Sequence, residues 1–316
     1  MTSSRKIVVV TRQTQVEELV QRFNTRGQAR FYIEANVGKG RFDTYQAEHD
    51  AYSRGVDTVE DLLPKGVPTQ AIDRAMLPTF TFGPDDVVVT IGPDGLVVNT
   101  AKYLDGQPLV AVNPDPRRID GVLLPFSTQS AAQAIERVLS DACRFANVTM
   151  AEAVLNDGQT LRAVNDLFIG QKTHTSARYR LNFQGDTEVQ SSSGMIVSTG
   201  AGSTGWLQSI VGGARAIAAH RGGVADDAEK ADPRFDWEAR QLVFNVREPF
   251  VSKTSSANMV CGTIDDDNPL EIISQMPRNG VIFSDGIEED FLEFNSGSIA
   301  QIRLAQQTLR LVLPDR

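Results

Sequence analysis

The residues best suited to chemistry lie in a glycine-bearing turn that follows a strand-like run. Val87 to Ile91 is short and apolar, and Gly92-Pro-Asp94-Gly95 follows it directly, ahead of a helical pattern. A strand that turns into a helix presents free N–H groups and the positive end of the helix dipole, which favours phosphate binding. Beside phosphate, Asp94 is unfavourable unless it binds Mg²⁺ or accepts a proton from an attacking hydroxyl. A plain Asp-Gly turn is the alternative.

A second segment, from Ser191 to Trp206, is rich in small residues and hydroxyls. A strand enters it, a helix is expected to leave it, and its glycines allow close approach to a ligand. Its hydroxyl and N–H groups suit ribose or phosphate, and the candidate binding residues are Thr199, Gly202, Ser203 and Thr204. A flexible Ser/Gly linker is less favoured, because the apolar Met195–Val197 and Trp206 flank the segment.

A third feature is the polar pair Asn165-Asp166 inside an otherwise apolar strand. Such a pair needs hydrogen-bond partners, either in a ligand or in neighbouring backbone. Taken alone, the pair does not decide between these two.

The elements that must position these motifs alternate between strand and helix in the first part of the chain. We expect strands at Ile7–Val10, Ala29–Ile33, Val87–Ile91 and Leu109–Val112. Helical spacing marks residues 16–23, with Gly27 at the C-cap position, and also 44–77 and 96–104. The alternation predicts an α/β fold with a Rossmann-like parallel sheet and helices on both faces.

The pattern changes after Pro125. A helix is expected over 130–141, and strand-like segments then dominate, beginning with a hairpin around Asn156-Asp-Gly158. The sequence therefore predicts an N-terminal α/β domain over 1–125 and a β-rich C-terminal domain over 126–316, with roughly the last 20 residues returning to the first domain. Arg221 to Asp236, rich in glycine and acidic residues, is expected to be a solvated surface loop.

Composition narrows the function classes. The 316 residues carry a net charge of −9, which argues against a nucleic-acid partner. No apolar stretch is long enough to span a bilayer, so no membrane partner is expected, and the start of the chain suits a cytoplasmic protein. Cys143 and Cys261 are expected to be reduced, largely buried thiols.

The scattered histidines and basic residues add little. His49, His174 and His220 show no metal-ligand spacing, so no protein metal site is predicted. Lys102, Arg117 and Arg118 are candidate phosphate neighbours, whereas Arg12 is interpreted first as a solvated loop residue and Trp206 as a packing residue.

The three motifs, in this order, resemble the NAD kinase family. The family's Gly-Gly-Asp-Gly loop is matched by Gly92–Gly95, its Asn-Glu pair by Asn165-Asp166, and its Thr-Gly-Ser-Thr-Ala-Tyr stretch by Ala201–Trp206. Further runs are similar to the subgroup that includes the mitochondrial NAD kinases: Val112–Gly121, Asn165–Gly170, Arg247–Phe250 and Asp285–Ala300. The resemblance covers residues 5 to 313, loosely over the first 85. The Gly-x-Asp-Gly loop is shared with diacylglycerol-kinase-like lipid kinases, and the later motifs favour the NAD branch.

The resemblance implies ATP-dependent phosphorylation of NAD at the 2′-hydroxyl of its adenosine ribose, giving NADP, with Mg²⁺ accompanying ATP. Asp94 would act as the base, while Gly92 and Gly95 would border the phosphates. Asn165 and Asp166 would hold the dinucleotide, and Thr204 with its neighbours would line the same crevice between domains. NAD and ATP are the implied partners, together with further copies of the chain in a homodimer or higher homo-oligomer.

Four departures from the family pattern keep alternatives open. Pro93 removes a backbone N–H from the loop, and Leu96 replaces a threonine. Asp166 is one methylene shorter than the usual Glu, and Ala201 lacks a hydroxyl. The alternatives are a kinase of the same fold acting on another hydroxyl, in a sugar, lipid or nucleoside, and a dinucleotide-binding protein without turnover. A lipid acceptor is less favoured, because no membrane-facing amphipathic helix is visible.

Overall fold

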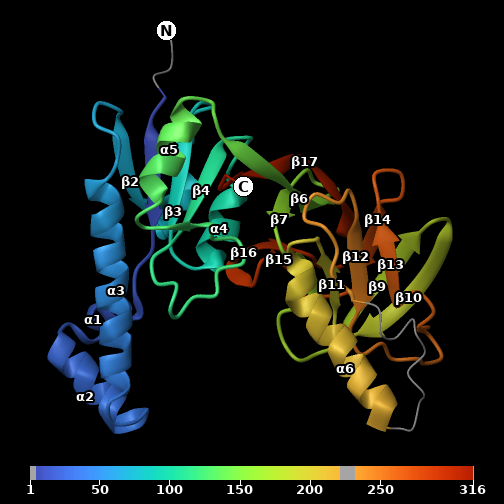
Figure 1. Ribbon diagram of the computed structural model, residues 1–316. Helices are drawn as coiled ribbons and strands as arrows, with labels where there is room; N and C mark the ends of the chain where they lie inside the picture. Colours follow the sequence, from blue (N-terminus) through green and yellow to red (C-terminus); the bar gives the residue numbers. More distant parts are fainter. Residues whose placement is uncertain (1–4, 221–231, 316) are drawn as a thin grey trace. The chain divides into compact units, whose positions relative to one another are not determined.

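The computed structural model describes residues 5–220 and 232–315 and divides into two compact units (Figure 1). Unit 1 comprises Met1–Ala146 and Arg310–Arg316, and unit 2 comprises Asn147–Leu309. Unit 1 therefore extends beyond residue 125, where the sequence placed its boundary, and includes the helix α5 (Ala131–Leu139).

Unit 1 is built on a parallel sheet. Its strands lie in the order β17–β4–β3–β1–β2, where β17 contributes Arg310 and Leu311, and β5 also pairs with β4. The bounds are β1 Ile7–Thr11, β2 Thr69–Asp73, β3 Val87–Ile91, β4 Pro108–Asn113 and β5 Phe126–Ser127. All of β3, and all of β1 except Thr11, is buried, which explains their nearly continuous β-branched composition.

One face of this sheet is covered by α3 (Arg41–Asp61) and α5. Tyr52 and Val59 of α3 belong to the same buried cluster as Ile135 of α5 and the strand residues Val9 and Val89. The short helix α4 (Asp94–Ala101) follows β3 directly, and it begins at the turn that carries the candidate chemistry.

The first predicted strand after β1 is wrong. Ala29–Ile33 lies in a helix, α2 (Arg26–Asn36), which the Thr25 side chain caps by accepting the N–H of Gln28. Ala29 and Ile33, four residues apart, are its buried positions, so the apolar residues follow helical spacing. Gly27 lies in the first turn of α2. The preceding helix α1 (Gln15–Phe23) ends instead at Asn24, which has φ of 63°.

Unit 2 contains two antiparallel sheets. The first has the order β10–β9–β14–β17, with β6 and β7 off this path, and the second has the order β13–β12–β11–β8–β15–β16. The bounds are β6 Arg144–Leu155, β7 Thr160–Ala163, β8 Asp166–Gln171, β9 Ala177–Phe183, β10 Asp186–Ser192, β11 Met195–Ser198, β12 Leu242–Val246, β13 Cys261–Ile264, β14 Leu270–Ser274, β15 Gly280–Ser284, β16 Ile287–Glu293 and β17 Ile299–Leu313. The two strands expected near the carboxyl end are therefore one continuous strand, β17.

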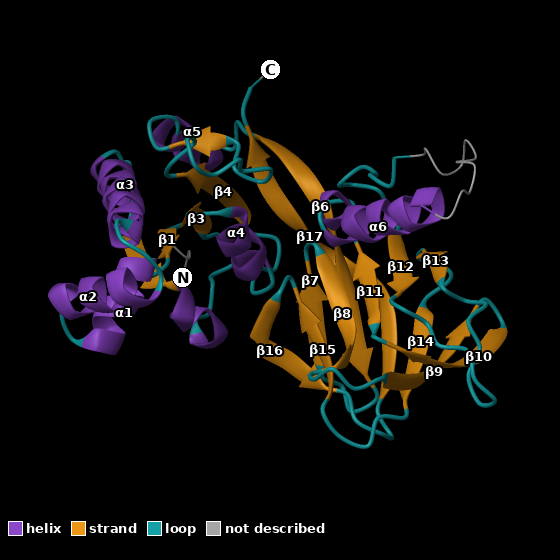
Figure 2. Ribbon diagram, turned by 90° about the horizontal axis from the view of Figure 1, so that it is seen from below, coloured by secondary structure: helices purple, strands orange, loops and turns teal. Residues whose placement is uncertain are grey.

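The core of unit 2 lies between its two sheets. Leu167, Val197 and Phe244 of the second sheet share a buried cluster with Tyr179 and Ile272 of the first. The helix α6 (Trp206–His220) lies along the second sheet (Figure 2). It packs on the face away from this core, where Leu207 clusters with Ile196 and Phe168.

Three further predictions concern the membrane-spanning potential of the helices, the two cysteines and the predicted surface loop. Among the described helices, none combines the length and apolarity that a bilayer span requires. Both cysteines are free, but the expected burial is wrong for Cys261, which is exposed at the start of β13 because its strand has β12 on one side only. Residues 221–231 of the predicted surface loop lie outside the described residues.

Candidate active site

Asp94 is the first residue of α4, three residues after the last residue of β3. The turn before it is fixed by the N–H of Gly92, which donates to the carbonyl of Val112 at 3.2 Å. A Cβ on Gly92 would lie 2.9 Å from a methyl group of Leu96, so glycine here lets Leu96 pack closely beneath the turn. Leu96 is buried, which accounts for an apolar residue at this position.

The Asp94 side chain is half-buried and held by backbone. Its Oδ1 accepts the N–H of Leu123 at 2.7 Å, and its Oδ2 accepts the N–H of Val122 at 3.3 Å. The N–H groups of Asp94 and Gly95 have no acceptor among the described residues, as expected in the first turn of a helix. The turn therefore offers an anchored carboxylate and two free donors to an anion.

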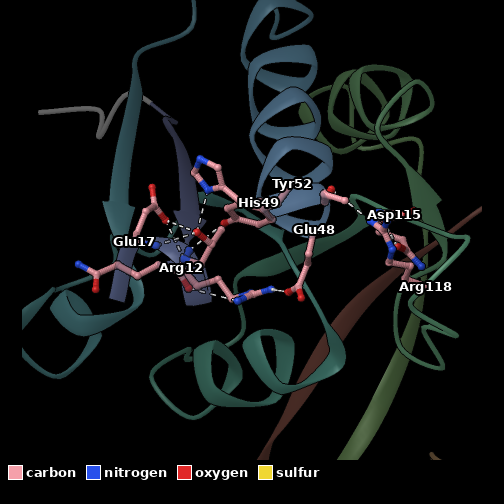
Figure 3. Close-up of polar contacts among 11 residues, drawn as sticks. Arg12, Glu17, Glu48, His49, Tyr52, Asp115 and Arg118 are labelled. Carbon is pink, nitrogen blue, oxygen red and sulfur yellow. Dashed lines mark hydrogen bonds and ion pairs between the residues drawn. The ribbon is translucent and has the colours of Figure 1, made fainter. Parts of the chain in front are cut away.

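A cavity of about 250 Å³, which we call the edge cavity, lies beside this turn. Its lining comprises Arg12, Glu48, Tyr52, Pro93, Pro114, Asp115, Arg118 and Ile119. Arg12 donates to Glu48 at 3.0 Å, and its guanidinium lies 5.2 Å from the centre of the Tyr52 ring (Figure 3). Arg118 donates to Asp115 at 3.0 Å and to the carbonyl of Ala47 at 3.2 Å. Both arginines of this cavity are thus held by acidic partners.

In unit 2, Asp285 organises the backbone of the Asn165-Asp166 pair. Its Oδ1 accepts the N–H of Asn165 at 2.7 Å and that of Asp166 at 3.3 Å, and its Oδ2 accepts the N–H of Val164 at 3.2 Å. Asp285 adopts φ of 56°, a left-handed conformation that aspartate tolerates better than most residues. Three consecutive N–H groups are therefore satisfied by one carboxylate.

The side chains of this pair differ in their surroundings. Asp166 is 8% exposed, and burial, with a smaller contribution from the charge of Asp285, raises its pKa to about 7. Asn165 is half-buried, and its amide has no hydrogen-bond partner among the described residues. Near neutral pH the pair can present an amide and a carboxyl group that also exists protonated, both suited to ligand hydroxyls.

The Thr199 segment packs directly against this pair. The N–H of Thr199 donates to the carbonyl of Asn165 at 2.9 Å, and its hydroxyl donates to the carbonyl of Val164 and accepts the N–H of Gly202 at 3.2 Å. A Cβ on Gly202 would lie 2.0 Å from the carbonyl oxygen of Asn165, a distance no side chain tolerates. Gly202 is therefore required for this close approach.

The two remaining hydroxyls of the segment are placed differently. Ser203 is buried and donates to the carbonyl of Gly200 at 2.6 Å. Thr204 is exposed, and its hydroxyl donates to the carbonyl of Ala201 at 3.4 Å. Ser203 thus stabilises the turn, whereas Thr204 is accessible to a ligand.

An aromatic cavity of about 560 Å³ lies between β8, β15, β16 and α6 in unit 2, and its lining includes Phe168, Lys172, His174, Trp206, Arg247 and Phe291. Trp206 stacks on Phe168 with an interplanar angle of 6°, and Arg247 lies 5.3 Å from the centre of the Trp206 ring. Trp206 thus packs within unit 2, as predicted, and also lines a cavity. Aromatic faces beside cations suit a ligand that has both a planar ring and negative charge.

The structure places the candidate residues in two groups. Gly92, Asp94 and Gly95 form the turn in unit 1, and Asn165, Asp166, Thr199, Gly202 and Ser203 form one hydrogen-bonded region in unit 2, with Thr204 adjoining it. Of the basic residues, Arg117 and Arg118 line one cavity, whereas Lys102 is buried at the other end of α4. The described residues hold no cluster of three His, Cys, Asp or Glu side chains arranged to bind a metal.

Three residues that the sequence did not suggest contact the candidate site or line its cavities: Asp285, Tyr52 and Arg54. In the sequence, Asp285 is notable only as the first residue of the run Asp285–Ala300, which resembles NAD kinases. The residues around it do not indicate that its side chain binds the backbone of residues 164–166. Arg54 and Tyr52 lie on a helix whose polar residues resemble an ordinary solvated face. The one available signal was helical spacing, since Tyr52 follows Glu48 by four residues and Arg54 follows Asp50 by four.

These features define a class: an α/β protein with a glycine-bearing strand-to-helix turn, a carboxylate fixed at that turn, and a separate β-rich unit. Comparison with solved structures agrees. A yeast NADH kinase complexed with NADH has a TM-score of 0.58 at 12% identity, covering 99% of this chain and 85% of that one. An NAD kinase from Archaeoglobus fulgidus in complex with ATP has a TM-score of 0.52 at 14% identity, covering 96% and 92%. The chain has this fold, and the predicted fold class is confirmed.

Relatives found by sequence similarity are also named NAD kinases. An NAD kinase of Methylococcus capsulatus is 31% identical over 140 residues, which are 40% of this chain and 46% of the relative. The human mitochondrial NAD kinase 2 is 24% identical and is matched over 84% of this chain and 74% of its own length. The chain spans about half the length of the first of these relatives, and no family model matches it. The resemblance to NAD kinases predicted from the motifs is thus confirmed.

Proposed function

We propose that this protein is an NAD kinase, which transfers the γ-phosphoryl group of ATP to the 2′-hydroxyl of the adenosine ribose of NAD. The observation that carries the proposal is Asp94: a half-buried carboxylate, fixed by two backbone N–H groups, in the same helical turn as two free N–H donors. Phosphoryl transfer needs a group that takes the hydroxyl proton and donors that hold the phosphates, and this turn provides both.

The reaction assigns each group a role. The ribose 2′-oxygen bonds to the γ-phosphorus while the bond from that phosphorus to the β–γ bridging oxygen breaks, so that ADP leaves. Asp94 accepts the proton of the 2′-hydroxyl. The N–H groups of Asp94 and Gly95, at the positive end of α4, stabilise negative charge on the phosphates, while Gly92 lets the backbone approach them.

The residues of unit 2 bind the dinucleotide in this proposal. Asn165 and Asp166 hydrogen-bond its hydroxyl groups, and Gly202, Ser203 and Thr204 form a turn next to them. The Thr199 hydroxyl joins this turn to the backbone of Val164 and Asn165. The aromatic cavity accepts a planar ring of the dinucleotide, and Arg247 and Lys172 offset the charge of its diphosphate. Both NAD and ATP are then substrates of this chain.

Mg²⁺ enters the proposal with ATP. In this proposal the ion is held mainly by the phosphates of ATP and by water, as Mg²⁺ usually is in nucleotide sites. Asp115 fits as a protein ligand, since each of its oxygens accepts one hydrogen bond, from the N–H of Arg117 or from Arg118, and keeps a second lone pair. When bound, Mg²⁺ would neutralise charge on the transferring phosphates.

We also propose that the chain functions as a homodimer or higher homo-oligomer. Phe250 and Val251, in the segment after β12, are 64% and 67% exposed, so two adjacent apolar side chains are available to a second copy of the chain. Light scattering of the purified protein tests this proposal, which predicts a mass of at least twice 34.5 kDa.

The function is tested by incubating the protein with NAD, ATP and Mg²⁺ and measuring NADP. The proposal predicts NADP formation, and product analysis should place the new phosphate on the adenosine ribose. A parallel panel of NADH, sugars, nucleosides and lipids, with inorganic polyphosphate as a second donor, identifies any other acceptor or donor. Phosphorylation of another acceptor without NADP formation would replace the proposal with a kinase of different specificity.

A further inference from the structure

We propose that a second cavity of unit 1 binds the phosphoanhydride chain of the phosphoryl donor. This arginine cavity, of about 640 Å³, lies next to the edge cavity and shares Pro114, Asp115 and Arg118 with it. The edge cavity is lined by Pro93, the residue before Asp94, so the arginine cavity adjoins a space that reaches the turn of the candidate base. The inference rests on the proposed function for the identity of the donor, but not for the chemistry of the site.

Three arginines line the arginine cavity, and the guanidinium groups of two of them form no hydrogen bond or ion pair with the described residues. Arg118 is paired with Asp115, whereas the guanidinium groups of Arg54 and Arg117 have no hydrogen bond or ion pair with any residue that the structure describes. Asp50 is the other acidic residue of the lining, and it accepts a hydrogen bond from Gln46. The charges of Arg54 and Arg117 therefore exceed the remaining acidic charge.

The hydroxyl of a mostly buried residue, Thr128, also lines this cavity. Thr128 is only 7% exposed, and its hydroxyl has no partner among residues 5–220 and 232–315. Because this hydroxyl has no partner among those residues and is not itself buried, it is available as a donor to a ligand in the cavity. Thr128 and Gln129 come directly before Ser130, the N-cap of α5, whose side chain caps none of the first N–H groups of that nine-residue helix. The positive end of α5 adds to the attraction for anions.

Together these groups suit a chain of phosphates rather than a single anion. Arg54 lies on α3, Arg117 follows β4, and Thr128 follows β5, so donors from three segments line one space of about 640 Å³, which is larger than a single phosphate needs. Arginine is the side chain best suited to bridging phosphate oxygens, because its fork donates two parallel hydrogen bonds. ATP and inorganic polyphosphate both carry such a chain.

The test uses the full chain and inorganic tripolyphosphate with Mg²⁺ as the probe, measured by calorimetry. We expect binding by the wild type, about a tenfold weaker affinity for Arg54→Ala and for Arg117→Ala, and a larger loss for the double variant. Thr128→Val should weaken binding a few-fold. Arg74→Ala is the matched control, because Arg74 is exposed in the same unit and lines neither cavity, and it should change affinity less than twofold.

The outcomes separate this inference from the proposed function. Unchanged affinity in the double variant, or no tripolyphosphate binding by the wild type, would overturn the arginine cavity even if NADP is formed. Loss of affinity in these variants supports the site even if NAD is not the acceptor. Where the chain turns over, KM for ATP or for polyphosphate should rise with KM for NAD unchanged, and the donor whose KM rises identifies the source of the phosphate chain.

Discussion

Asp285 and Asp166 are joined by two hydrogen bonds, each donated by a backbone N–H, while the charges of their carboxylates repel. The N–H of Asp285 donates to the carbonyl of Asp166 at 2.9 Å, and the N–H of Asp166 donates to the Asp285 carboxylate at 3.3 Å. The same contact that fixes the turn places a negative charge beside a buried carboxyl group. The raised pKa of Asp166 follows from this placement together with its burial.

Stability should fall with rising pH because of Asp166. Its pKa is raised from the ordinary aspartate value of 3.8 to about 7 in the fold, so between these values the native state holds a proton that the unfolded chain has lost. The contribution of Asp166 to the free energy of unfolding therefore decreases from pH 4 to pH 7 and is constant above that. Asp166→Asn should remove this slope and be more stable than the wild type at pH 8. Denaturant unfolding from pH 4 to 8 measures it, and parallel curves for the two proteins would contradict the assignment.

Asp285→Asn tests whether the carboxylate positions the Asn165-Asp166 pair. Asparagine tolerates the left-handed conformation, but it replaces one acceptor oxygen with a donor, so at least one N–H of residues 164–166 loses its partner. We expect a loss of about 1–3 kcal/mol in the free energy of unfolding. We also expect weaker dinucleotide binding and a lower pKa for Asp166. Calorimetric titration with NAD at several pH values measures both; unchanged binding and pH dependence would exclude the positioning role.

Much of this arrangement was predictable, and the rest depends on long-range contacts. The buried runs Ile7–Val10 and Val87–Ile91, and the turn at Gly92, indicate a parallel sheet with a helix after β3, because composition and spacing act locally. The strand predicted at Ala29–Ile33 is wrong because two of its apolar residues, Phe31 and Tyr32, face solvent and obscure the helical spacing. The role of Asp285 was not predictable, since it lies 119 residues from Asp166 in the sequence.

Gly202→Ala should disrupt the region around Asn165. The new Cβ would lie 2.0 Å from the carbonyl oxygen of Asn165, so one of the two backbone segments must move. We expect a lower thermal unfolding midpoint and loss of NAD binding. Gly213→Ala, in α6, is the matched control: a Cβ there meets nothing within 4 Å, so it should be neutral or stabilising by about 0.4–1 kcal/mol. If both variants behave alike, the close approach at Gly202 does not matter.

The most direct test of the account is NADP formation by Asp94→Asn compared with the wild type. The substitution keeps the shape of the side chain and an acceptor for the Leu123 N–H, but removes the group that takes the proton. The account predicts a loss in kcat of about 10²–10⁴, with NAD affinity within a few-fold of wild type and a folded protein by circular dichroism. Wild-type kcat in the Asp94→Asn variant would contradict the assignment of Asp94 as the base.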